Sequence, residues 1–134
     1  MGAEPWFNVV PYEEDIAAAL QKAREEVFRT GNYTRTGRKK PGSIEEARER
    51  GGEDGTASIL DVDAVARRRR AGAVAPLTPG TLRKLFGTER PTHAQFSGNP
   101  FAVWDRLERG QAVYVILYRD DAPDEVLFTG LSWD

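Results

Sequence analysis

The longest run of strand-forming residues lies near the C-terminus, over residues 112–118 (Ala-Val-Tyr-Val-Ile-Leu-Tyr). Both alternating sets of side chains in this run are apolar or amphipathic, whereas a strand exposed on one face alternates apolar with polar residues. The pattern predicts a strand in the middle of a sheet, covered on both faces. The polar segment 119–125 separates it from a second strand over 126–133. Together they predict an antiparallel hairpin with a loop of roughly five to seven residues.

The N-terminal part of the chain predicts one strand followed by one long helix. The strand is the β-prone run 6–12. Apolar residues then recur at positions 16, 19, 20, 23 and 27, the spacing of one stripe along a helix. The glycine at position 31 predicts the end of this helix.

The middle of the chain predicts short helices separated by loops. Ser43 and Glu46 have capping-box spacing and predict a helix that ends near residue 51. Residues 58–60 predict a short strand, followed by a helix over 61–70, and residues 71–77 predict a loop. Thr78-Pro79 and Asn99-Pro100 each predict the start of a further helix.

Strands at the two ends with helices between them predict an α+β fold. The N-terminal strand joins the C-terminal hairpin in a small, mainly antiparallel sheet of three or four strands, packed against several helices. A doubly wound parallel fold needs strands and helices in regular alternation, which this chain lacks. A length of 134 residues suits a single α+β domain, 1–134.

Composition and charge narrow the classes of function. A formal net charge of −2 gives no overall attraction to nucleic acid or to an anionic membrane. The lack of cysteine excludes a disulfide framework and a thiolate nucleophile and fits a reducing cytoplasm. Neither a signal peptide nor an apolar run of roughly 18–20 residues is present. We therefore expect a cytoplasmic protein that binds no membrane. Its many Arg, Ala, Gly and Val residues are typical of GC-rich bacteria.

Four residues are candidates for acid–base catalysis. His93 is the only histidine, the side chain best suited to a general base near neutral pH. Glu13 and Glu14 lie where the first strand meets the first helix, and Asp61 follows the short run 58–60. Two such carboxylates can form an acid–base pair or bind a divalent cation. The alternative is that these acids stabilise helix N-termini and that His93 is a loop residue.

The candidate ligand site combines basic residues with one aromatic. Tyr33 precedes Arg35 and Arg38, whose guanidinium groups suit a phosphate or a carboxylate. With the four arginines 67–70, the same residues are candidates for RNA binding. The alternative is a solvated charged surface. The glycine-rich segments match no nucleotide-binding pattern, and no metal-binding spacing occurs, so we expect no cofactor and no metal.

The large aromatic residues have two interpretations. The simpler one places them in the core. If several are exposed together, they instead line a pocket or a partner surface. The residues concerned are Trp6, Phe101, Trp104, Phe128 and Trp133.

Three stretches of the chain carry a resemblance to other proteins. They are Tyr-Glu-Glu-Asp-Ile at 12–16, Ser-Ile-Leu-Asp at 58–61 and Phe-Thr-Gly-Leu-Ser-Trp-Asp at 128–134. In these stretches the chain resembles short uncharacterised proteins of GC-rich bacteria. The resemblance covers most of the length and implies no activity, cofactor or site residue.

These observations favour a small bacterial binding or accessory protein that recognises a partner protein or a small anionic ligand. One alternative is a cofactor-free enzyme, and the other is an RNA-binding module. The enzyme would use Glu13, Glu14, Asp61 and His93 on an anionic substrate held by Arg35 or Arg38. A pocket that collects the acids and the histidine favours the enzyme, whereas an apolar surface patch with exposed acids favours partner binding.

Overall fold

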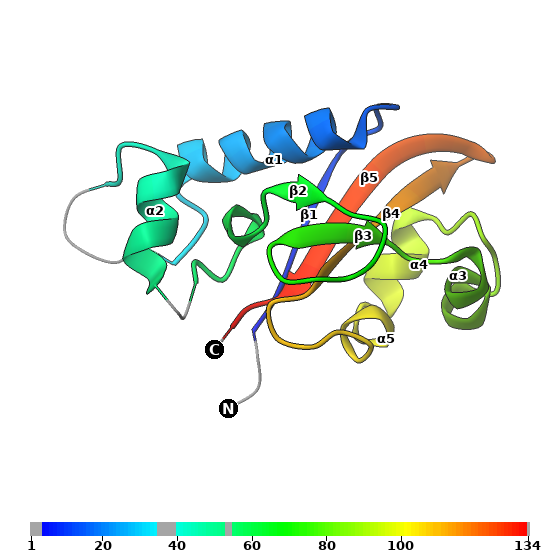
Figure 1. The fold of residues 1–134 in the computed structure, drawn as a ribbon. Coiled ribbons are helices and arrows are strands. Elements are labelled where there is room, and N and C mark those ends of the chain that lie inside the picture. Colours follow the sequence, from blue (N-terminus) through cyan, green and yellow to red (C-terminus); the bar gives the residue numbers. More distant parts are fainter. Residues whose placement is uncertain (1–3, 35–39, 53–54, 134) are drawn as a thin grey trace.

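The computed structural model describes residues 4–34, 40–52 and 55–133. Its middle layer is a mixed sheet of five strands in the order β1-β5-β4-β3-β2 (Figure 1). On one side of the central strand the pairs are antiparallel, and on the other they are parallel. The strands are β1 (Pro5–Pro11), β2 (Ala64–Val65), β3 (Ala73–Pro76), β4 (Ala112–Arg119) and β5 (Ala122–Leu131).

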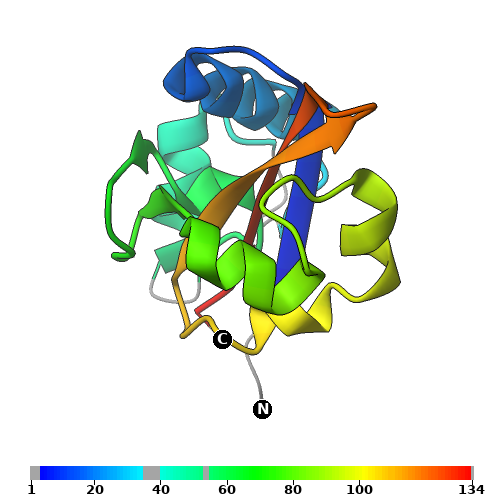
Figure 2. The ribbon, with the colours of Figure 1, turned by 90° about the vertical axis from the view of Figure 1, so that its right-hand side faces the viewer.

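Helices cover both faces of the sheet (Figures 1 and 2). α1 crosses one face, with α2 and the 3₁₀ helix η2 packed beside it, and α3, α4 and α5 cover the other. No helix in the described part of the chain is long and apolar enough to cross a membrane. The helices are α1 (Ile16–Thr30), α2 (Ile44–Gly51), η2 (Ile59–Asp61), α3 (Pro79–Phe86), α4 (His93–Gly98) and α5 (Phe101–Trp104).

The prediction that residues 112–118 form a strand covered on both faces is confirmed. β4 is the central strand of the sheet. Its odd-numbered side chains from Val113 to Leu117 are buried in the core under α3, α4 and α5. Ala112 and Tyr114 pack in the other core, under α1. A strand that is apolar on both faces needs a helical layer on each side, which sets the three-layer arrangement.

The first helix is confirmed, and its ends are set by two residues. Asp15 is the N-cap, and its carboxylate accepts a hydrogen bond from the N–H of Ala18. Gly31 ends the helix in the left-handed conformation, with φ of 74°, which glycine adopts without a steric penalty. The helix starts at Ile44 and Pro79 are confirmed in the same way, because the side chains of Ser43 and Thr78 cap α2 and α3.

The prediction of a small, mainly antiparallel sheet is wrong. The segment expected to be a loop contains β3, which pairs in parallel with β4, and β2 pairs in parallel with β3. Ala73, Val74 and Ala75 are fully buried. A short apolar run bounded by turn residues is typical of a buried parallel strand. These four residues form a strand because they satisfy the backbone groups of β4 on the side away from β5.

Three further expectations need correction. Residues 58–60 do not form a strand, because the 3₁₀ helix η2 occupies Ile59–Asp61. Residues 61–70 do not form a helix: β2 follows η2, and Arg67 to Arg70 lie in the exposed connection to β3. The hairpin loop is two residues long, because Asp120 and Asp121 both adopt positive φ, as a tight hairpin turn requires. Residues 93–98 form α4, capped by Thr92.

Gly130 gives a direct test of how closely the layers approach one another. A Cβ at this position would lie 2.7 Å from the carbonyl oxygen of Gln111 and 2.7 Å from the ring of Trp6. We predict that Gly130→Ala lowers the free energy of unfolding by about 2 kcal/mol, because neither neighbour can move without disturbing the sheet. Chemical denaturation measures this change.

Gly98→Ala is the matched control. A Cβ at Gly98 meets no atom within 4 Å, and the residue ends a helix with ordinary backbone angles. We expect this variant to be as stable as the wild type or more stable by up to about 1 kcal/mol. Equal stability of the two alanine variants would contradict the close packing at Gly130.

Candidate functional site

The four predicted catalytic residues are not brought together. Glu13 forms an ion pair with Lys22 at 2.9 Å, at the start of α1. Glu14 is exposed, and it makes no hydrogen bond or ion pair with any other described residue. Asp61 and His93 lie on η2 and α4, on opposite faces of the sheet. Within the described residues, no hydrogen bond or ion pair joins any two of the four.

Asp61 has a structural role. Its Oδ1 accepts the backbone N–H of Thr56 at 2.7 Å and the hydroxyl of Thr56 at 2.8 Å. Gly55 passes so close that a Cβ there would lie 2.7 Å from Oδ2. The carboxylate therefore holds the turn before η2. Asp61 also lines a surface cavity of about 390 Å³ with Glu49 and Trp133.

His93 is the first residue of α4 and contacts a carboxylate. Its Nδ1 lies 2.9 Å from Oε1 of Glu125 on β5, and both side chains are partly exposed. This pairing leaves Nε2 directed away from Glu125, so the imidazole is positioned as a histidine–carboxylate pair. Among the described residues, His93 has no hydrogen bond to a hydroxyl group.

The predicted ligand-binding residues are only partly described. Arg35 and Arg38 lie outside the described residues. The ring of Tyr33 stacks on that of Phe28, with centroids 6.2 Å apart. The Tyr33 hydroxyl is buried without a hydrogen-bond partner in the described part of the chain.

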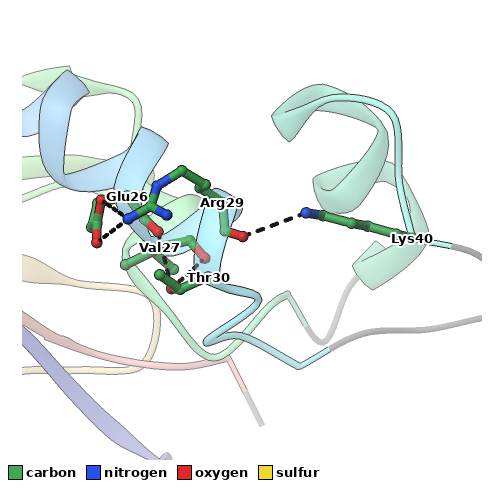
Figure 3. A network of polar contacts seen from close by, with 5 residues as sticks. All are labelled: Glu26, Val27, Arg29, Thr30 and Lys40. Atoms are coloured by element: carbon green, nitrogen blue, oxygen red, sulfur yellow. Dashed lines mark hydrogen bonds and ion pairs between the residues drawn. The ribbon is translucent and has the colours of Figure 1, made fainter.

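Lys40 belongs to the same basic cluster and contacts the C-terminal end of α1 (Figure 3). Its ammonium donates to the carbonyl of Arg29 at 3.5 Å and lies over the ring of Phe28. A cation near the last carbonyls of a helix is favoured by the helix dipole. Beside it, Glu26 binds the Arg29 guanidinium and raises the pKa of Arg29. These charges stabilise the helix terminus and are not directed into a common pocket.

A second group of charges lies between α1 and α2. Arg24 is buried, and burial lowers its pKa; nearby Arg48 lowers it further, while Asp63 and Glu45 raise it. Arg48 binds Asp63 at 2.9 Å. These contacts join α1, α2 and the segment after η2. No group of three carboxylate or imidazole side chains in the described residues is placed to hold a metal ion.

Partly exposed aromatic side chains on the face covered by α3, α4 and α5 are linked to one another through the buried ring of Phe96. Phe7 is 52% exposed and Phe101 is 64% exposed. Phe7 contacts Phe96 edge to face at 5.7 Å, Phe96 contacts Trp104 at 6.5 Å, and Trp104 contacts Phe101 at 5.3 Å. We call Phe7, Phe101 and Trp104 the aromatic patch. Large exposed apolar side chains that adjoin one another are typical of interaction surfaces.

The aromatic patch adjoins the open edge of β1. In the pairing of β1 with β5, the even-numbered residues of β1 direct their backbone groups toward β5, as the bonds at Glu4 and Tyr12 show. The N–H and C=O groups of Phe7 and Val9 therefore point outward. No backbone group in the described residues pairs with them. Pro5 and Pro11 stand at the two ends, where a missing N–H costs nothing on an edge strand.

The opposite edge of the sheet is protected. β2 has only two residues, and it is followed by the four exposed arginines 67–70. Short edge strands and nearby positive charge both prevent strands of other chains from pairing. The two edges thus differ. β1 presents an edge of seven residues beside aromatic side chains, whereas β2 presents an edge of two residues beside four arginines.

Comparison with protein-family models, with curated proteins and with solved structures finds no match to this chain. The candidate site therefore depends on the geometry of the chain itself. The sequence predicts Phe101 as part of a binding surface only if several aromatic residues are exposed together. It does not indicate Phe7 or Val9 as binding residues. The available signal was the pair of prolines at the two ends of the strand, which is typical of an edge strand.

Trp104 is held in the patch by a buried hydroxyl. Its indole N–H donates to Oγ1 of Thr129 at 2.7 Å, and this hydroxyl donates to the carbonyl of Trp6 at 2.7 Å. Thr129 is fully buried. We predict that Thr129→Val lowers the free energy of unfolding by about 1–3 kcal/mol, since it removes the partner of both groups at once.

Thr129→Ser is the control, because it keeps the hydroxyl and loses only a methyl group. We expect it to retain most of the stability that the valine variant loses. Denaturation curves of the three proteins compare the effects. A valine variant as stable as the serine variant would show that the hydroxyl does not hold Trp104.

Proposed function

We propose that this protein is a binding module that takes an extended segment of a partner protein along the open edge of β1. The partner segment adds a strand beside β1 and places apolar side chains over the aromatic patch. The proposal rests on one observation: the unpaired backbone groups of Phe7 and Val9 lie beside exposed aromatic rings. In strand addition, backbone hydrogen bonds supply affinity and pockets for alternate side chains supply specificity.

The geometry explains why both features belong to one surface. The side chains of Phe7 and Val9 lie on the face covered by α3, α4 and α5. An added strand would place every second side chain on that same face. Those side chains would lie next to Phe7, with Phe101 and Trp104 further along the patch. Aromatic side chains dominate the energy of many interfaces.

The enzyme hypothesis receives less support. Glu13, Asp61 and His93 have separate partners, and Arg35 and Arg38 lie outside the described residues. The RNA-binding hypothesis relied on the arginines 67–70, which are exposed beside the short edge strand β2. Tyr33, the aromatic residue beside the first basic cluster, stacks on Phe28.

Selection from a library of displayed random peptides tests the proposal with the full chain. We predict that enriched peptides carry aromatic or β-branched residues at every second position. Phe101→Ala should weaken their binding at least tenfold, measured by fluorescence anisotropy. The free energy of unfolding should change by less than about 0.5 kcal/mol, because the side chain is mostly exposed.

Val65→Ala is the matched control, since Val65 is an exposed apolar residue on β2, at the other edge of the sheet. Its binding should equal that of the wild type. A series of N-methylated peptides separates strand addition from side-chain contact alone. Methylation at one alternating set of peptide nitrogens should abolish binding, and at the other set it should not. Binding unaffected by Phe101→Ala, or equal loss for both sets, would contradict the proposal.

A further inference from the structure

A second surface feature lies beside β4, away from the open edge of β1. It is a cavity of about 310 Å³ that begins where β3 ends, at Pro76. This size is within the range of small-molecule sites, which are about 300–1,000 Å³. The residues that determine its chemistry are Leu77, Leu82, Arg90, Tyr114, Ile116 and Tyr118.

The backbone of Ile116 faces this cavity. In the pairing of β4 with β5, the odd-numbered residues of β4 bond to β5, as the register and the bond from the Leu131 N–H to the Gln111 C=O show. Ile116 therefore directs its N–H and C=O to the other side, where β3 has already ended. Among the described residues no group pairs with either. The N–H donor and the C=O acceptor of Ile116 are therefore both unpaired at the wall of the cavity.

This stretch of open backbone is closed at both ends. The C=O of Tyr114 accepts the N–H of Leu77 at 3.4 Å, and the N–H of Tyr118 donates to the C=O of Pro91 at 2.8 Å. Tyr118 lies four positions beyond Tyr114 on the strand, a distance of about 13 Å. At the same rise a single amino-acid residue blocked at both ends spans about 7 Å and leaves room for Leu77 and Pro91 at the two ends, whereas a blocked tripeptide spans about 13 Å, the whole stretch, and leaves none.

The walls of the cavity come from both faces of the sheet. Leu77 and Leu82 pack with the core under α3, α4 and α5, while Tyr114 packs with the core under α1. The cavity thus lies in the plane of the sheet, at the place that a longer β3 would fill. A side chain paired with Ile116 would lie on the face of Ile116, between the two tyrosines.

The charges at the cavity are already balanced. Glu89 binds Arg83 at 2.6 Å. The guanidinium of Arg90 lies over the ring of Tyr118 and 3.7 Å from the carboxylate of Asp121. Burial raises the pKa of Tyr114, so its hydroxyl stays neutral. These features favour a neutral occupant with an apolar side chain.

We infer that this cavity binds a single N-acylated amino-acid unit in extended form, with an apolar side chain. The N–H of the ligand donates to the C=O of Ile116, and the ligand C=O accepts the N–H of Ile116. These are the two bonds that a paired residue of a neighbouring antiparallel strand would make. The ligand side chain occupies the space between Tyr114 and Tyr118. The site is distinct from the edge of β1 and does not depend on the function proposed for that edge.

Titration of the ¹⁵N-labelled full chain with N-acetyl-L-leucine methylamide, followed by NMR, tests the inference. We expect saturation with a dissociation constant below ~1 mM and the largest shift at the Ile116 amide, with Phe7 and Val9 unmoved. The D-enantiomer should bind at least tenfold more weakly, because its side chain points to the other face. An analogue methylated on the leucine nitrogen should lose about tenfold, since it cannot donate to Ile116.

Two variants of α3 link binding to the cavity. Leu82→Trp fills the cavity and should abolish binding, whereas Lys84→Trp places the same ring on an exposed position of α3 and should leave binding unchanged. The ligand series on the wild-type protein remains decisive if Leu82→Trp does not fold. Absence of binding at 1 mM, equal binding of both enantiomers, or tighter binding of the blocked tripeptide N-acetyl-Ala-Leu-Ala methylamide would overturn the inference.

Discussion

The central strand β4 is apolar on both faces, and the rest of the structure follows from that constraint. Water must be excluded from each face, so the chain places α1 on one side and α3, α4 and α5 on the other. The strand also has two rows of backbone hydrogen-bonding groups. β5 satisfies one row and β3 satisfies part of the other. With both faces covered, the edges are where the sheet meets solvent or a ligand.

The unequal lengths of the strands determine where backbone groups remain open. β3 ends before β4 does, which leaves Ile116 unpaired beside a cavity. β1 is the outermost strand and leaves Phe7 and Val9 open beside exposed rings. Both places combine polar backbone groups with apolar side chains, and this combination suits ligands with an amide backbone. Several carboxylates and arginines, in contrast, pair with one another at helices and loops.

Patterns within a short stretch of sequence were enough to predict the elements that are stabilised mostly by their own residues. The stripe along α1, its cap at Asp15 and its end at Gly31 act within one helix. The run 112–118 is long and uniformly apolar. β3 was missed because four small residues become a strand only through pairing with β4, which is distant in sequence. The turn at Asp120 and Asp121 was missed because it lacks the glycine that usually marks a tight hairpin.

The candidate site was harder to predict than the fold, for a physical reason. A carboxylate such as Glu13 or Asp61 serves equally well in an ion pair, a loop bond or a catalytic pair, and only its neighbours decide. Exposure of Phe7 and Phe101 likewise depends on how far the helices extend over the sheet. The sequence placed aromatic residues in the core by default, which is correct for Phe128 and wrong for Phe101.

Amide hydrogen exchange of the full chain, followed residue by residue by NMR, tests the central claim that two stretches of strand edge are open. We predict that the amides of Phe7, Val9 and Ile116 exchange orders of magnitude faster than those of Asn8, Val10, Val115 and Leu117 on the same strands. Alternation of fast and slow exchange along β1 would support an edge that is free to accept a partner strand. Uniform protection of Phe7, Val9 and Ile116 would contradict it, because their backbone groups would then already be paired.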